Sequence, residues 1–120
     1  MKLLIQFPTF ARAGKFLKVL DMYIESSGDE NDIFFNINCD KADSQMTNPH
    51  IEERINFILS KKPNISGMIN YDWDTDKISA INDHVDERDF DIVICASDDM
   101  VPRINSWDQE IVDAMMEHFP

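Results

Sequence analysis

The sequence predicts an α/β fold, a three-layer α/β/α domain built around a mostly parallel sheet. Two observations lead to this class. Four short segments with strand character, 2–7, 32–39, 65–71 and 89–96, are each followed by a segment with helical character. The first and last of them are almost continuously apolar, as strands covered on both faces are. Strands that alternate with helices favour parallel pairing through right-handed crossovers.

The first strand, "KLLIQF" (2–7), leads through the turn "PTFARAG" into a helix. In this helix, residues at helical spacing form one face that is expected to point inward, and Gly28 is expected to end the helix. That face consists of Phe16, Leu20, Tyr23, Ile24 and Ser27.

The second strand is "DIFFNINC" (32–39), and a helix begins near "NPHIEERINFIL". Asn48 suits its N-cap and Pro49 its first turn, while Pro63 closes the unit. The apolar stripe of this helix is Ile51, Ile55, Ile58 and Leu59.

The third strand, "ISGMINY" (65–71), precedes a short helix in "DKISAINDHV". The fourth, "DFDIVICA" (89–96), is the most apolar and is expected to be central. Ser106 and Gln109 have capping-box spacing ahead of a last helix in "WDQEIVDAMMEHF". The residues expected to face inward from it are Ile111, Val112, Met115 and Met116.

Length and charge limit the function. The 120 residues predict one domain (1–120), and 11 basic against 23 acidic side chains give a formal charge of −12, which disfavours nucleic-acid binding. The N-terminal run is too short for a signal peptide, and no stretch is long enough for a membrane span. Cys39 and Cys95 are expected to be reduced, buried hydrophobes, consistent with the cytoplasm.

Polar loops follow three of the strands: "PTFARAG", "CDKADS" and "SDDMVP". Because ligands of open parallel sheets bind beyond the carboxyl ends of the strands, these loops form the expected binding edge. Asp98 and Asp99 there supply the hard oxygen ligands that Mg²⁺ or Mn²⁺ prefers. The alternative is a solvated turn, with Asp98 as an Asx-turn residue.

Other polar residues have ordinary explanations as well. Arg12 and Lys15 are typical of solvated residues near a helix start, although Arg12 could also bind a phosphate through two hydrogen bonds. Asp40 fits either a ribose contact or an exposed turn. The segment "YDWDTDK" (71–77) lacks the Gly and the distal Glu of an EF-hand. No Ser-His-Asp or Cys-His arrangement and no Gly-rich phosphate loop can be argued.

Taken together, the loops resemble those of nucleotide-sugar glycosyltransferases of the GT-A type, family-2-like, which have a Rossmann-like sheet. "IQFPTFARAGKFLKVLDMY" is similar to the family's opening strand and its Pro-Thr/Ser-x-x-Arg segment. "INCDKAD" is similar to its second strand, which ends in Asp. "DKISAIN" resembles its Lys-x-x-Ala-x-Asn segment, and "FDIVICASDDMVP" resembles the strand that carries a DxD-like metal motif. The resemblance covers essentially the whole chain.

The resemblance implies a UDP- or GDP-sugar as ligand, with Mn²⁺ or Mg²⁺ as cofactor and sugar transfer to an acceptor as activity. It implies that Asp99, assisted by Asp98, holds the metal. The residues that it places at the nucleotide are Pro8, Thr9, Arg12, Asp40, Lys77, Asn82 and Asp98.

The sequence also departs from the family. Its motif is Ser-Asp-Asp-Met rather than a strict Asp-x-Asp, and the chain ends at Pro120, before the acceptor-binding half. No residue is a defensible catalytic base, so we expect the isolated chain to transfer sugar poorly or not at all. The main alternative is a noncatalytic α/β interaction or regulatory domain. A nucleotidyltransferase fits less well, and a scaffold that self-associates through an open sheet edge is the remaining alternative.

Overall fold

The computed structural model describes residues 1–9, 11–72 and 87–118. Its strands are β1 (Lys2–Thr9), β2 (Asp32–Asp40), β3 (Ile65–Asp72) and β4 (Ile92–Cys95). Its helices are α1 (Ala13–Ser26), α2 (Pro49–Leu59) and α4 (Trp107–His118), with a short 3₁₀ helix, η1, at Glu87–Asp89. The four predicted strands are therefore confirmed, as are three of the predicted helices. The helix predicted within 76–85 lies outside the described residues.

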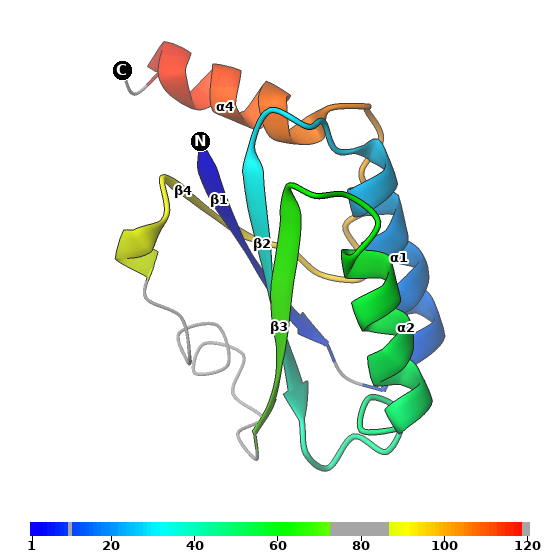
Figure 1. The fold of residues 1–120 in the computed structure, drawn as a ribbon. Coiled ribbons are helices and arrows are strands. Elements are labelled where there is room, and N and C mark those ends of the chain that lie inside the picture. The colour runs from blue at the N-terminus through cyan, green and yellow to red at the C-terminus, as the bar shows by residue number, and fades with distance from the viewer. Residues whose placement is uncertain (10, 73–86, 119–120) are drawn as a thin grey trace.

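The four strands form a single parallel sheet in the order β3-β2-β1-β4 (Figure 1). This confirms a small parallel α/β fold. One expectation is wrong, because β4 lies at an edge of the sheet and β1 and β2 are central. Only four residues of the apolar segment pair in the sheet, and Val93 is 38% exposed. Hydrophobicity alone does not place a strand at the centre, since an apolar edge strand can be covered by other means.

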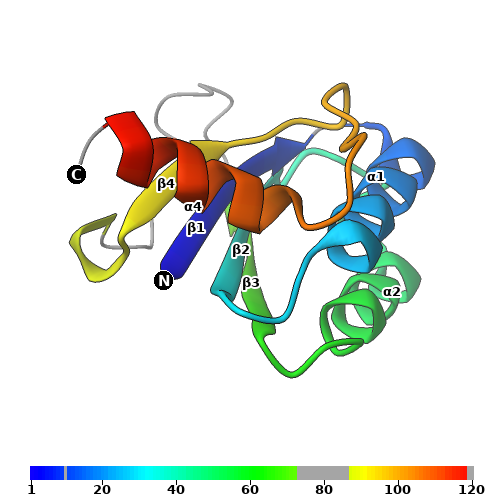
Figure 2. The ribbon, with the colours of Figure 1, turned by 90° about the horizontal axis from the view of Figure 1, so that it is seen from above.

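One face of the sheet carries the hydrophobic core beneath α1 and α2, which lie on the same side of the sheet (Figure 2). Alternate residues of β1, among them Leu3, Ile5 and Phe7, point to this face and are fully buried. The Phe7 ring meets that of Phe16 in α1 edge-to-face at 4.9 Å between centroids. The predicted inward faces of α1 and α2 are confirmed, with Ile51 only partly buried.

The last helix, α4, lies across the end of the sheet at which the strands begin (Figure 1). Its first turn fixes it there, since the Trp107 indole N–H donates to the Tyr23 carbonyl at 2.7 Å and Asp108 accepts from the Gly28 N–H at 2.8 Å. Helices on both faces therefore stay a prediction, because the described helices that pack flat on the sheet share one face.

This placement corrects the predicted inward face of α4. Val112 is buried and Ile111 partly so, but Met115 and Met116 are 38% and 51% exposed. Only the first turns of α4 reach the rest of the domain, so its later apolar residues have nothing to pack against among the described residues. Ser106 has a φ of 56° instead of the extended backbone of an N-cap, so the predicted capping box does not form.

The second face of the sheet carries a row of buried amides. Asn36 on β2 donates to Gln6 on β1 at 2.8 Å, and Asn70 on β3 donates to Asn36 at 2.6 Å and to Asn38 at 3.3 Å. All four side chains are buried, and Gln6 Nε2 has no hydrogen-bond partner in the part of the chain that the structure describes. Where these amides lie, β1, β2 and β3 are apolar on one face only. The sequence predicted that β1 would be apolar on both faces, and at Gln6 this is wrong.

The two cysteines differ. Cys39 is buried as predicted, and burial together with the nearby Asp43 carboxylate raises the pKa of its thiol to about 12. Cys95 is exposed on the edge strand, so its predicted burial is wrong. Among the described residues, no helix is long and apolar enough to cross a membrane.

Gly67 of β3 allows the sheet to approach α2. A Cβ atom there would lie 2.6 Å from the Phe35 carbonyl oxygen and 3.1 Å from Leu59 Cδ1. We therefore expect Gly67→Ala to lower the free energy of unfolding by about 1–3 kcal/mol, measured by urea denaturation. Gly14→Ala is the control, because a Cβ at Gly14 meets nothing within 4 Å. Equal stability of the two variants would show that the close approach at Gly67 is unimportant.

Candidate functional site

The loops after β1 and β2 are tied together by a buried carboxylate. Asp43 accepts hydrogen bonds from the Ala11 N–H at 2.5 Å and from two N–H groups of its own loop, those of Gln45 and Met46. Gln45 in turn accepts from the Ala13 N–H at 3.2 Å. Ala11 has a φ of 55°, a left-handed backbone that is uncommon for a residue with a Cβ. The contact with Asp43 holds this strained turn directly before α1.

The loop after β4 is tied to α1 at two points along the helix. The Tyr23 hydroxyl donates to the Met100 carbonyl at 2.5 Å, and the Ser106 N–H donates to the Ser26 carbonyl at 2.6 Å. At its beginning, the Ala96 N–H continues the β1 pairing by donating to the Gln6 carbonyl. The chain between β4 and α4 therefore runs along α1, and this brings residues 97–99 to the N-terminal end of that helix.

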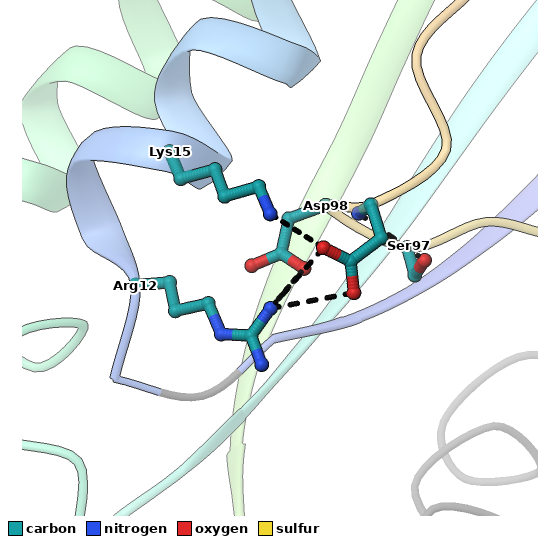
Figure 3. A network of polar contacts seen from close by, with 5 residues as sticks. Arg12, Lys15, Ser97 and Asp98 are labelled. Carbon is teal, nitrogen blue, oxygen red and sulfur yellow. Dashed lines mark hydrogen bonds and ion pairs between the residues drawn. The ribbon is translucent and has the colours of Figure 1, made fainter.

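Four charged side chains meet at this point (Figure 3). Arg12 Nη1 lies 3.3 Å from Asp98 Oδ1 and 3.3 Å from both carboxylate oxygens of Asp99. Lys15 Nζ lies 2.5 Å from Asp99 Oδ1. Arg12 precedes α1 and Lys15 lies in its first turn, so both cations approach from the same helix end. We call these four residues the charged cluster.

The two carboxylates of the charged cluster differ in environment. The Asp98 side chain is 10% exposed, whereas that of Asp99 is 63% exposed. The hydrogen bond from Lys15, with its charge and that of Arg12, lowers the pKa of Asp99. Burying the Asp98 carboxylate next to an apolar strand is costly, and its contact with Arg12 offsets part of that cost, whereas Asp99 stays largely in solvent.

Of the other predicted nucleotide-site residues, Thr9 and Asp40 lie at the ends of the two central strands. Both are buried, and neither the Thr9 hydroxyl nor Asp40 Oδ2 has a hydrogen-bond partner among the described residues. Asp40 Oδ1 accepts from the Ala42 N–H at 2.8 Å, so Asp40 is not the exposed turn residue of the alternative explanation. Strand alternation puts the two residues on opposite faces of the sheet, with Pro8 half-buried on the Asp40 side.

The predicted site is thus brought together only in part. Arg12, Asp98 and Asp99 are in contact, whereas Thr9 and Asp40 lie at the same edge of the sheet but on its two opposite faces. Lys77 and Asn82 lie outside the described residues.

Two residues of the site were not predicted. Lys15 was assigned to solvent, although its position three residues after Arg12 puts both on one side of a helix start. Asp43 gave no signal beyond its place in a polar loop, because its partners are backbone groups from another part of the chain.

The carboxylates of Asp98 and Asp99 are the groups that could bind a divalent cation at this place. In the part of the chain that the structure describes, no group of three or more His, Cys, Asp or Glu side chains could hold a metal. Asp98 and Asp99 offer two adjacent carboxylates, and Mg²⁺ or Mn²⁺ commonly takes one or two from the protein with phosphate and water completing the shell. The donor set fits a metal that arrives with a phosphate ligand.

Comparison with protein-family models, curated proteins and solved structures finds no match for this chain.

The lowered pKa of Asp99 can be tested by titration. Because Lys15 is the main cause of its lowered pKa, we expect the carbon-13 titration of the Asp99 carboxyl to have its midpoint below the usual value, and Lys15→Met to raise it. A lowered pKa in the folded state means that the contribution of Asp99 to stability is present above the unfolded pKa. That contribution is lost as pH falls through the folded value.

The control is Lys18→Met, which removes the same charge from an exposed position on α1. An equal shift of the Asp99 midpoint in both variants would point to general charge and not to the contact with Lys15.

Proposed function

We propose that this chain is a nucleotide-sugar-binding domain of the GT-A glycosyltransferase type. It binds a UDP- or GDP-sugar together with Mn²⁺ or Mg²⁺ and serves sugar transfer to an acceptor. The observation that carries the proposal is the charged cluster, in which Arg12 meets Asp98 and Asp99 from 86 and 87 residues away in the sequence. It lies at the edge of the sheet where parallel α/β proteins bind their ligands.

The chemistry requires charge stabilisation more than proton transfer. In glycosyl transfer the diphosphate leaves as its negative charge grows, and a divalent cation held by Asp98 and Asp99 would stabilise that charge. Arg12 can donate two parallel hydrogen bonds to phosphate oxygens, which orients the leaving group. Lys15 adds a second positive charge at the same place.

The nucleoside would lie toward the ends of the central strands. The Thr9 hydroxyl and Asp40 Oδ2 support this, because buried polar atoms normally have a hydrogen-bond partner and neither atom has one within the described ranges. Asp40 Oδ2 can accept from a base N–H or a ribose hydroxyl, as the resemblance implies. The roles of Pro8, Lys77 and Asn82 at the nucleotide rest on that resemblance alone.

We also propose that the sheet is Rossmann-like with helices on both faces, and that the protein is cytoplasmic.

A second candidate function is a noncatalytic interaction or regulatory domain. The observation that favours it is that each carboxylate already has a cation partner. Asp98 pairs with Arg12, and Asp99 pairs with Lys15 and Arg12, so both could have a purely structural role. In that case the charged cluster only fastens the loop after β4 to α1.

The test is titration calorimetry of the chain with UDP and with GDP, in the presence and absence of Mn²⁺. We expect binding that requires Mn²⁺ and that weakens about tenfold or more in Asp99→Ala, since even the loss of a residue that only supports a metal ligand typically costs about 10- to 100-fold. Asp29→Ala, at an exposed carboxylate in the turn after α1, serves as the control and should bind like the wild type.

Two results would contradict the proposal. If neither nucleotide binds with Mn²⁺, the noncatalytic function takes precedence. If UDP or GDP binds equally well without Mn²⁺ and in Asp99→Ala, the carboxylate pair is not the metal site.

A further inference from the structure

Both cations of the charged cluster converge on Asp99. Its Oδ1 atom lies 2.5 Å from Lys15 Nζ and 3.3 Å from Arg12 Nη1. Its Oδ2 atom lies 3.3 Å from the same Arg12 nitrogen. The contacts of Arg12 are longer than the 2.7–2.9 Å of a well-formed charge-assisted hydrogen bond. Lys15 therefore makes the closer contact with Asp99, and Arg12 makes the longer one.

Asp99 can leave this position without loss of the fold. Its side chain is 63% exposed, and those of Arg12 and Lys15 are about half exposed. The loop that carries Asp99 is fixed independently by the Tyr23–Met100 and Ser26–Ser106 hydrogen bonds. Breaking the ion pair therefore frees one side chain and leaves the loop anchored to α1.

A diphosphate and the Asp99 carboxylate would compete for the same donors. Both are anions with oxygens suited to the Arg12 guanidinium and the Lys15 ammonium, and a diphosphate carries the greater charge. We propose that the contact of Asp99 with Lys15 and Arg12 is autoinhibitory: Asp99 occupies the cation pair that takes the diphosphate of the donor. This inference rests on the proposed function, since it assigns that pair to the diphosphate.

The competition has a quantitative consequence. A ligand that needs a minor state of the protein binds more weakly by the fraction of molecules in that state. Removing the carboxylate of Asp99 should therefore tighten the binding of a diphosphate when no metal is present. In the same variant, metal-dependent nucleotide binding should weaken about tenfold or more. The two effects of one substitution have opposite signs, which a purely structural ion pair would not produce.

The probe is inorganic pyrophosphate, titrated calorimetrically in the presence of EDTA. We expect Asp99→Asn to bind it about fivefold tighter than the wild type, at the lower end of typical coupling between sites. Asp29→Asn is the matched control, because it makes the same change in net charge at an exposed carboxylate away from the cluster. Circular dichroism checks that both variants are folded.

A double-substitution cycle isolates the contact. In a Lys15→Met background the Asp99→Asn change should give a much smaller gain, since the main partner of Asp99 is already absent. A gain in Asp99→Asn no larger than in Asp29→Asn overturns the inference, as does an equal gain with and without Lys15.

These outcomes differ from those that test the function. Tighter pyrophosphate binding in Asp99→Asn, without any Mn²⁺-dependent binding of UDP or GDP, would uphold the competition and remove the nucleotide sugar as ligand. Metal-dependent nucleotide binding, with no effect of Asp99→Asn on pyrophosphate, would uphold the function and overturn the competition.

Discussion

Parallel pairing of β1 with β2 is the constraint on which the rest of the structure depends. With β3 and β4 added in the same direction, every described strand ends at one edge of the sheet, and the loop that follows each strand begins there. Residues as far apart as Arg12 and Asp99 become neighbours for this reason. The buried carboxylate of Asp43 then fixes the loops after β1 and β2 to each other, which sets where α1 begins and where its two cations lie.

The sequence was sufficient for the strands, for the inward faces of α1 and α2, and for the edge at which the polar loops gather, because each depends on local periodicity and on the direction of the chain. Periodicity failed for α4, where Met115 and Met116 are apolar at helical spacing yet exposed. A helical repeat shows that a face is apolar, but only the tertiary placement of the helix decides whether that face is covered. The edge position of β4 was missed for the same reason.

At the candidate site, residue type and position predicted that Arg12, Asp98 and Asp99 are functional candidates, but not that they touch one another. The contact depends on the path of the chain from β4 to α4, which is set by hydrogen bonds from Tyr23 and to Ser26 that no local pattern encodes. Lys15 was overlooked because an exposed lysine in a first helical turn is common. Its importance comes from the carboxylate opposite.

The amides on the second face of the sheet have a consequence for how the strands find their alignment. Apolar residues repeat every second position, so a shift of β2 by two residues along β1 would keep each apolar side chain on its own face. The shift that places Asn36 opposite Pro8 would put Phe34 opposite Gln6, so that Gln6 loses the amide that donates to it in the observed register. A buried amide that loses its partner costs about 1–3 kcal/mol. The amides thus discriminate between alignments that hydrophobic burial treats as equivalent.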